Sequence, residues 1–151
     1  MSDVYVRFVT SKWDPLSAVI RFKTDSWASH VEFAYSVRGK LWTLGSRADG
    51  VKVRLYDTYP TREEWYTAPG IEQAFDSCHK LLGKKYDFLD LFGIALDTDW
   101  HEDGRYICSE AVAWSFEDAG FPLLNTSISA FRIWPKDLLM SPYVRLAKKI
   151  K

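Results

Sequence analysis

Much of the first half of the chain alternates between apolar and polar positions in the way that predicts β-strands. In residues 30–37 every second side chain is apolar, so one face carries Val31 and Phe33 and the other carries His30 and Glu32. The same reasoning predicts further strands at residues 4–9, 41–44 and 51–55. Glycine-containing turns separate residues 30–37, 41–44 and 51–55 from one another, so the sequence predicts an antiparallel meander over these three strands.

Two longer segments have the spacing of helices with one apolar stripe. In residues 71–82 the apolar side chains recur every three or four positions, and Gly83 marks the end of the stripe. A second stripe begins at Cys108, and Gly120 follows its last turn. The sequence therefore predicts two helices that pack their apolar stripes on the sheet.

Three shorter segments complete the pattern. Residues 15–22 have helical spacing, with a proline near the first turn. Thr61 and Glu64 have the spacing of a capping box, which predicts a short helix at that point. Residues 143–149 are compatible with a last strand. Because the meander and the helices occupy separate parts of the chain, the expected fold class is α+β.

Length and charge narrow the possible functions. The chain has 151 residues, and we expect a single domain over residues 1–151. Its 20 Lys and Arg residues balance 20 Asp and Glu residues, so there is no overall basic field for binding nucleic acid. No apolar run approaches the length of a membrane span. The first residues lack the features of a signal peptide, which predicts a cytoplasmic protein.

The chain has two cysteines, too few for a disulfide scaffold or a four-cysteine zinc site. Cys78 lies within an apolar stripe, where a thiol packs as a small hydrophobic group. Cys108 lies where a polar stretch gives way to the second stripe, in the first turn of the predicted helix. Unpaired backbone N–H groups at such a position lower the pKa of a thiol and can stabilise an oxyanion. Cys108 is therefore a candidate nucleophile, and a buried small residue is the alternative.

One of the three histidines lies where a catalytic base could lie. His30 is on a predicted strand, whereas His79 points off an apolar stripe and His101 lies in a polar loop. A base on a rigid strand that faces a nucleophile at a helix N-terminus is the arrangement of papain in outline. The alternative for His30 is a hydrogen-bonded histidine at the surface.

Four motifs, in order along the chain, resemble those of the YiiX/YebB-like hydrolases, in the permuted branch of the NlpC superfamily. Trp-Ala-Ser-His-Val-Glu-Phe at residues 27–33 resembles the Ser-His-Val strand motif of that family, and Gly-Lys-Lys-Tyr-Asp-Phe at residues 83–88 resembles its Gly-Lys-Pro-Tyr-Asp-Phe motif. Tyr-Ile-Cys-Ser-Glu-Ala-Val at residues 106–112 resembles its Cys-Ser-Glu-Leu-Val nucleophile motif. Trp-Pro-Lys-Asp-Leu at residues 134–138, followed by Ser-Pro, is similar to its C-terminal Pro-x-Asp-Leu element. The histidine precedes the cysteine, which is the permuted order.

This resemblance implies a circularly permuted papain-like (NlpC-like) fold and a thiolate mechanism. Cys108 would attack an amide or ester carbonyl, and His30 would first deprotonate Cys108 and later protonate the leaving group. The expected activity is that of a cysteine amidase or peptidase on peptide or amide substrates of the peptidoglycan type, without a cofactor. A cytoplasmic enzyme would reach such a substrate through lysis or phage delivery.

Two residues are candidates for the group that orients His30. In the family a polar residue on the strand after the histidine strand usually has this role, and counting across the turn gives Thr43. Glu32 shares the strand face of His30 and supplies a carboxylate, so we favour it slightly over Thr43. The alternative for Glu32 is an exposed carboxylate. Tyr86 is expected to line the substrate site or assist the oxyanion, with a packed aromatic residue as its alternative.

One segment has most of the spacing of a calcium-binding EF-hand loop. Asp99, His101 and Asp103 precede a glycine, and Glu110 follows. His101, however, occupies a position that requires an oxygen ligand, and the loop would contain Cys108. We therefore predict no metal site.

Two other functions fit the same fold. One is an LRAT-like acyltransferase or thioesterase acting on lipids, although the chain has no apolar segment of the kind that anchors such enzymes. The other is a binding module that has kept the fold without catalysis. Thiol reactivity would separate the enzymes from the binding module, because an activated Cys108 would react with iodoacetamide at mildly acidic pH far faster than Cys78.

Overall fold

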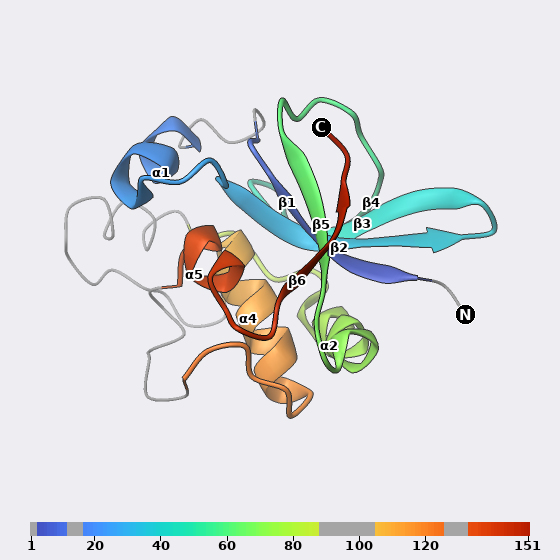
Figure 1. The fold of residues 1–151 in the computed structure, drawn as a ribbon. Helices are drawn as coiled ribbons and strands as arrows, with labels where there is room; N and C mark the ends of the chain where they lie inside the picture. The colour runs from blue at the N-terminus through green and yellow to red at the C-terminus, as the bar shows by residue number, and fades with distance from the viewer. Residues whose placement is uncertain (1–2, 12–16, 88–104, 126–132) are drawn as a thin grey trace.

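One antiparallel sheet organises the molecule (Figure 1). The computed structural model describes residues 3–11, 17–87, 105–125 and 133–151, and within these residues six strands form the sheet in the order β4-β3-β2-β1-β5-β6. The strands are β1 (Val4–Val9), β2 (His30–Val37), β3 (Lys40–Arg47), β4 (Gly50–Leu55), β5 (Glu63–Thr67) and β6 (Arg145–Lys149). The predicted meander corresponds to β2, β3 and β4, which are consecutive neighbours in the sheet.

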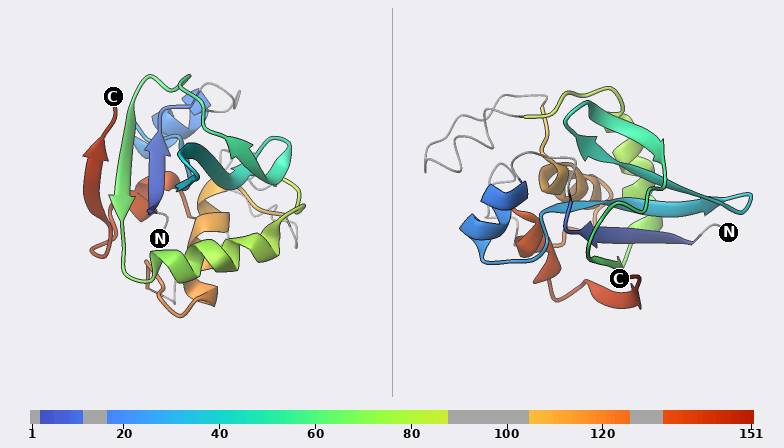
Figure 2. Two further views of the ribbon diagram at one scale, coloured as in Figure 1. Left: turned by 90° about the vertical axis from the view of Figure 1, so that its right-hand side faces the viewer. Right: turned by 90° about the horizontal axis from the view of Figure 1, so that it is seen from above.

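Two helices cover one face of this sheet. The described helices are α1 (Ser17–Thr24), α2 (Ile71–Cys78) with the short 3₁₀ helix η1 (His79–Leu81), α4 (Cys108–Asp118) and α5 (Pro135–Leu139), and α2 and α4 are the two that pack extensively on the strands. Figures 1 and 2 show α2 and α4 side by side beneath the strands, and both helices contact the sheet. The predicted α+β class is therefore confirmed for the described part of the chain.

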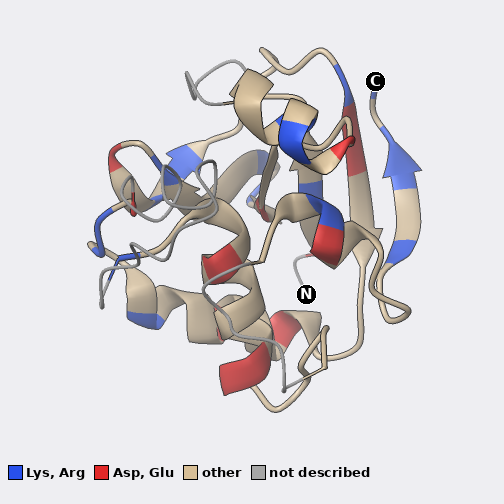
Figure 3. Ribbon diagram, turned by 90° about the vertical axis from the view of Figure 1, so that its left-hand side faces the viewer, with Lys and Arg blue, Asp and Glu red and all other residues tan. Residues whose placement is uncertain are grey.

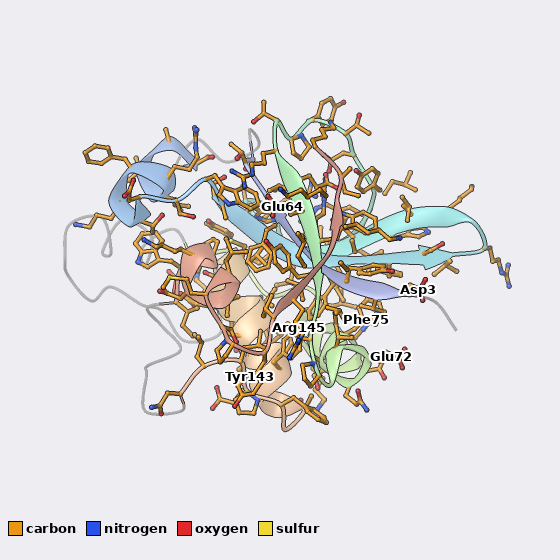
Figure 4. The ribbon with its side chains drawn as sticks, in the orientation of Figure 1. Asp3, Glu64, Glu72, Phe75, Tyr143 and Arg145 are labelled. Atoms are coloured by element: carbon orange, nitrogen blue, oxygen red, sulfur yellow. The ribbon has the colours of Figure 1, made fainter. Side chains whose placement is uncertain are left out.

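The apolar core lies between the sheet and these two helices. Phe33 on β2 stacks on Phe116 of α4 with their ring centroids 6.0 Å apart, and it meets Phe75 of α2 edge-on at 5.9 Å. Figure 4 shows Phe75 between its helix and the strands, where it also lies 4.6 Å from the ring of Tyr35. The apolar stripes predicted for the two helices thus pack on the apolar face predicted for β2.

The two longest predicted helices end close to the positions that the sequence indicates. The first is helical to Leu81 when η1 is included, and Gly83 follows with φ 86°. The second begins at Cys108, and Gly120, also with φ 86°, lies two residues beyond its end. A positive φ is costly for residues with a Cβ, so glycine stops both helices. The predicted helix at residues 15–22 appears as α1, which begins at Ser17, and Pro15 lies outside the described residues.

The prediction of a short helix at Thr61 and Glu64 is wrong, because this segment leads into strand β5. Glu64 lies opposite Phe8, and Trp65 lies opposite Arg7, in an antiparallel pairing with β1. The aromatic and threonine residues that follow Glu64 favour strands, and the pairing with β1 outweighs the local capping signal.

Among the residues that the structure describes, no helix combines the length and the apolar character that crossing a bilayer requires.

Candidate active site

Cys108 is the first residue of α4. The preceding Ile107 is extended, with φ −78° and ψ 168°, and the helical hydrogen bonds begin with the Ala111 N–H donating to the Ile107 carbonyl. The N–H groups of the first turn therefore have no partner within the helix and point toward its open end. Cys108 itself is 3% exposed and belongs to the apolar core. The predicted position in the first turn of a helix is confirmed.

The segment that leads into α4 is attached to one end of the sheet. Ser46, near the end of β3, donates its hydroxyl to the carbonyl of Tyr106 at 2.6 Å. The pairing of Phe33 with Leu44, continued by two residues, sets Ser46 beside Val31 at the start of β2. The N-terminus of α4 and the first residue of β2 therefore lie at the same end of the sheet. These are the elements that carry Cys108 and His30.

His30 and Glu32 form a pair on one face of β2. His30 Nε2 lies 3.1 Å from Glu32 Oε2, as expected for residues two apart on a strand. His30 is 4% exposed, so it is not the surface histidine considered as its alternative. Burial lowers the pKa of His30 below 6.5; Glu32 opposes this shift, and Arg47 and Arg7 add to it. A neutral imidazole at neutral pH is the form that can accept a proton.

Glu32 is fully buried and is shared by two arginines. Arg7, directly opposite on β1, donates from Nη1 to Oε1 at 2.8 Å. Arg47 donates to both oxygens, from Nη2 to Oε1 at 2.6 Å and from Nε to Oε2 at 3.2 Å. Burial alone would raise the pKa of Glu32, but His30 and Arg47 hold it well below its usual range. The predicted alternative of an exposed carboxylate is therefore wrong.

These contacts belong to a larger set of charges on the same face, which we name the buried charge cluster. Arg7 also donates to Glu63 at 2.8 Å, and Arg47 lies 3.1 Å from Asp57. The cluster consists of Arg7, Glu32, Arg47, Asp57 and Glu63. The hydroxyl of Tyr56 and the indole N–H of Trp65 donate to Glu63, at 2.8 and 2.7 Å. The face of the sheet turned away from α2 and α4 is thus a polar core.

Gly45 makes room for Glu32. A Cβ at position 45 would lie 2.5 Å from the Cβ of Glu32 and 3.3 Å from its Oε2. The first distance is shorter than atoms in proteins tolerate, and it involves an atom next to the backbone. Glu32 can keep its place because the residue beside it on β3 has no side chain.

Thr43 lies away from His30. Thr43 pairs with Ala34, four residues along β2 from His30, which corresponds to about 13 Å at ~3.3 Å per residue. Its hydroxyl is buried and has no hydrogen-bond partner. Of the two candidates for orienting His30, the structure brings only Glu32 next to the ring.

Tyr86 packs beside the residue that precedes the candidate nucleophile. It is 3% exposed and forms a small cluster with Ile20 and Ile107, against which Trp134 also packs. Tyr86 also lines a cavity of about 220 Å³ together with Lys84 and Lys85. The packed aromatic alternative describes its ring well, and a role toward substrate stays a prediction.

The other cysteine and histidines have the surroundings that the sequence predicts, where they are described. Cys78 is fully buried, and burial raises the pKa of its thiol to about 11, so it is unreactive at neutral pH. His79 is exposed, and its Nδ1 lies 2.9 Å from the Phe75 carbonyl. His101 and the calcium-like motif at residues 99–104 lie outside the described residues.

The described residues offer no group of three or more His, Cys, Asp and Glu side chains suited to hold a metal ion. At the candidate site, the carboxylate of Glu32 faces two guanidinium groups, which repel a further cation. These residues do not fit a metal centre.

The pattern of the sequence did not point to Arg7 and Arg47. Arg7 stands within an otherwise apolar strand, and a charged residue at such a position signals a buried partner. The partners of Arg7 are 25 and 56 residues away, so local periodicity cannot identify them.

The fold is similar to that of a known protein. The crystal structure of the metalloprotein YiiX from Escherichia coli O157:H7 (DUF1105) superimposes with a TM-score of 0.74, covering 96% of this chain and 95% of YiiX at 16% identity. A scan against protein-family models finds no match. A search of curated proteins finds no significant similarity. The chain therefore has a YiiX-like fold, as its sequence motifs indicated.

Proposed function

We propose that this protein is a cysteine hydrolase in which Cys108 is the nucleophile, His30 the base and Glu32 the group that orients the base. The observation that carries the proposal is the buried His30–Glu32 pair at the end of the sheet where α4 begins with Cys108. By the alternation of β2 this pair is on the face turned away from α4, so the contact between the thiol and the imidazole around this end of the sheet is part of the proposal. In a triad, the third group holds the imidazole in one tautomer and stabilises the imidazolium. Glu32 meets Nε2, which leaves Nδ1 as the ring atom for the thiol.

The proposed reaction has two halves, formation and hydrolysis of an acyl-enzyme, and Cys108 and His30 act in both. His30 takes the proton from the Cys108 thiol, and the thiolate attacks the carbonyl carbon of an amide or ester. The backbone N–H groups at the start of α4 stabilise the oxyanion. When the C–N or C–O bond breaks, the imidazolium gives its proton to the leaving group. In the second half, His30 deprotonates a water whose oxygen bonds to the acyl carbon, the C–S bond breaks to release the acid, and the Cys108 thiolate takes the proton back from His30.

The chain order supports a circularly permuted papain-like arrangement. His30 lies on β2, early in the chain, and Cys108 lies on a helix that comes later, after β5 and α2. Papain-like enzymes of ordinary order have the cysteine helix first. In the proposed arrangement the same two elements meet with the chain connected in the other order.

The proposed substrates are peptides or amides that carry carboxylates, a class that includes peptidoglycan peptides. The cavity beside Tyr86 is lined by Lys84 and Lys85 and lies next to the segment leading into α4, because the Tyr106 N–H donates to the Lys85 carbonyl at 3.0 Å. Lys84, Lys85 and Arg105 outnumber the carboxylate of Asp49 in this lining, and Asp49 is already paired with Lys52 and Arg54, so the cavity favours an anionic group on the substrate. The proposed substrate class therefore depends on the proposed activity of Cys108 and His30.

Alkylation by iodoacetamide tests the nucleophile. Cys108 should be alkylated at about pH 6 much faster than Cys78, because only a thiolate attacks and the Cys78 thiol is held protonated by burial. Peptide mass spectrometry gives both rates in one sample, with Cys108→Ser and Cys78→Ser as matched controls. Equal, slow alkylation of the two residues in the folded protein would rule out an activated nucleophile.

A trapped acyl-enzyme tests the reaction itself. After rapid acid quenching, an activated peptide ester should leave an acyl mass on the peptide that contains Cys108, and Cys108→Ala should abolish it. A fatty acyl ester tested in parallel identifies an acyltransferase or thioesterase, if it alone acylates Cys108. Slow alkylation of Cys108 together with no turnover of either ester would favour a binding module over an enzyme.

A further inference from the structure

We propose that Arg47 is a positioning residue that holds Glu32 in the orientation in which it meets His30. This inference rests on the proposed function, because it concerns the base of the Cys108–His30 pair. Among the described contacts Arg47 meets Glu32 and Asp57, so in this proposal its effect on the reaction passes through Glu32.

The contacts of Arg47 fix the plane of the Glu32 carboxylate. Its Nη2 reaches Oε1 at 2.6 Å, and its Nε reaches Oε2 at 3.2 Å. Two parallel hydrogen bonds from one guanidinium prevent the carboxylate from rotating about its last C–C bond. Oε2, the oxygen held by Nε, is the one that lies 3.1 Å from His30 Nε2. The clamp therefore fixes the carboxylate oxygen that faces the imidazole at ion-pair distance, without a well-aligned hydrogen bond between the two groups in this structure.

Arg7 does not provide the same restraint. It meets Glu32 through a single contact, from Nη1 to Oε1 at 2.8 Å, and its other guanidinium nitrogen Nη2 bonds Glu63 at 2.8 Å. Its side chain has no exposed surface. Arg7 links β1 to the neighbouring strands β2 and β5, which is a structural task. Its substitution would leave buried carboxylates without a counter-charge, so it is unsuitable as a test.

Arg47 can be substituted more safely, because it is the last residue of β3 and 13% of its side chain is exposed. Asp57, equally exposed, lies 3.1 Å from its Nη2 and holds the guanidinium from the other side. The contacts thus run in one line from Asp57 through Arg47 and Glu32 to His30. Arg7 and Glu63 are the other charged members of the buried charge cluster on this face.

Arg47 acts on His30 through charge as well as through geometry, and two variants separate the effects. The positive charges of Arg47 and Arg7 lower the pKa of His30, whereas Glu32 raises it. Arg47→Gln removes both the charge and the clamp, so the pKa of His30 should rise. Arg47→Lys keeps the charge but cannot form two parallel bonds to a carboxylate, so only the clamp is lost.

The matched control is Arg54→Gln. Arg54 lies on the neighbouring strand β4 with 15% of its side chain exposed, forms an ion pair with Asp49 and donates to the Gly45 carbonyl at 3.0 Å. It resembles Arg47 in exposure and in having a carboxylate partner, but it has no contact with Glu32 among the described interactions. General effects of losing a largely buried arginine from these two neighbouring strands should therefore be the same in both variants.

The experiment combines an NMR titration of the histidine rings with steady-state kinetics on the peptide ester. Three histidines give few ring signals, and His79→Gln and His101→Gln variants assign them. We expect Arg47→Lys to lower kcat about 10- to 100-fold with little change in KM and in the pKa of His30, as for a misoriented catalytic group. Arg47→Gln should lower kcat as much and also raise the pKa of His30. Arg54→Gln should change neither quantity.

Each failure has a distinct signature. If both Arg47 variants keep the kcat and the His30 titration of the wild type, Arg47 does not position the base. If Arg54→Gln matches Arg47→Lys, the effect is a general loss of stability, and the inference is overturned. If wild-type Cys108 is unreactive toward iodoacetamide and the wild type does not turn over the ester, the proposed function fails. In that case the His30 titration of Arg47→Gln still shows whether Arg47 acts on this ring.

Discussion

Glu32 is a carboxylate without exposed surface whose oxygens are shared by two guanidinium groups and one imidazole. It therefore has a structural role in addition to the proposed catalytic one. Removing one member of a buried charge network leaves the others uncompensated, which is more costly than losing a surface ion pair.

We expect Glu32→Gln to lower both kcat and stability, and Thr43→Val to leave both almost unchanged. The loss of the Glu32 charge should reduce the free energy of unfolding by about 3–5 kcal/mol. Val fits the space of Thr43, whose buried hydroxyl has no partner, so its removal should be neutral or stabilising by about 1 kcal/mol. Urea unfolding and steady-state kinetics measure both effects. A Thr43→Val variant slower than Glu32→Gln would transfer the orienting role to Thr43.

His30 should make the protein less stable in weak acid. Its folded-state pKa is lowered from 6.5, mainly by burial, so the unfolded chain binds this proton at a higher pH than the folded chain. The resulting stability is complete above pH 6.5 and is lost as the pH falls toward the folded-state pKa. Glu32, whose pKa is lowered from 4.5, acts in the same direction only below that value.

Comparison of the wild type with His30→Gln isolates this contribution. Between about pH 5 and pH 7 the unfolding free energy of the wild type should decrease more steeply with acid, by about 1.4 kcal/mol for each unit of pKa difference. Urea unfolding at several pH values gives the two slopes. Parallel curves would mean that His30 binds its proton equally well in the folded and unfolded chains.

At the scale of residues, the sequence indicated His30, Glu32 and Cys108 but not their environment. Alternation along β2 placed His30 and Glu32 on one face, and the structure confirms that they meet. Alternation also left open the alternative that His30 and Glu32 are at the surface, and this alternative was wrong. The reason is Arg7, opposite Glu32 on another strand: burial of a polar face depends on pairing between strands, which local periodicity does not contain.

At the scale of elements, α2 and α4 each carry one cysteine, in different positions. Cys78 is the last residue of α2 and Cys108 the first of α4, and both belong to the apolar core. The sequence placed Cys108 in the first turn as a candidate nucleophile, with a buried small residue as the alternative. The structure shows Cys108 to be nearly as buried as Cys78, at 3% and 0% exposed.

The two alanine variants should therefore separate activity from stability less sharply than position alone suggests. Cys108→Ala should abolish hydrolysis and Cys78→Ala should preserve it, while each reduces the free energy of unfolding by about 1 kcal/mol. The measurements are ester turnover and urea unfolding of both variants. Activity in Cys108→Ala combined with inactivity in Cys78→Ala would show that the nucleophile is misassigned.

Elements with strong periodicity were predicted well, and β5 was not. The strands at residues 4–9 and 30–37 have the predicted bounds, and the C-terminal strand appears as β6. In β5, Glu63 and Trp65 face the buried charge cluster and Glu64 and Tyr66 face the other side, so neither face is a simple apolar one. Because carboxylates lie on both faces, the segment has no alternating apolar pattern that would predict a strand. The capping-box spacing of Thr61 and Glu64 therefore decided the prediction of a helix.

At the scale of the whole molecule, β6 protects one edge of the sheet. Its residues are exposed, and Figure 3 shows the basic residues near its C-terminal end beside the acidic part of β5, where Lys149 pairs with Glu64. Charged edge strands of this kind discourage pairing with another chain. Without β6, the edge of β5 would present unpaired backbone groups next to Trp65 and Tyr66.

Removal of residues 145–151 should therefore lower stability and promote association. Each lost β5–β6 hydrogen bond should reduce the unfolding free energy by about 0.5–1.5 kcal/mol. Light scattering during size-exclusion chromatography should show larger species than for the full chain. Lys148→Gln with Lys149→Gln keeps the strand and removes two charges, so it separates the loss of pairing from the loss of charge. A truncated chain as stable and as little associated as the full one would contradict this role.

The overall fold could be predicted from the sequence because four of its motifs occur in the order typical of a known fold family. The superposition with YiiX at 16% identity shows that the arrangement persists when few residues are shared. The order of strands in the sheet, with β1 between β2 and β5, was not predicted. It depends on which distant segments pair, and in this chain Arg7, Glu32 and Glu63 join three of them.

The missing side chain at position 45 also restricts the evolutionary history of the site. Any larger residue there would collide with the Cβ of Glu32, so a carboxylate could enter position 32 only after, or together with, a glycine on the neighbouring strand. The two positions are therefore epistatic: alanine at position 45 is harmful when Glu32 is present and should be tolerated when position 32 is also glycine. A lineage that moved the proposed orienting carboxylate to another strand would keep this constraint as long as position 32 had a Cβ, and only glycine at position 32 would remove it.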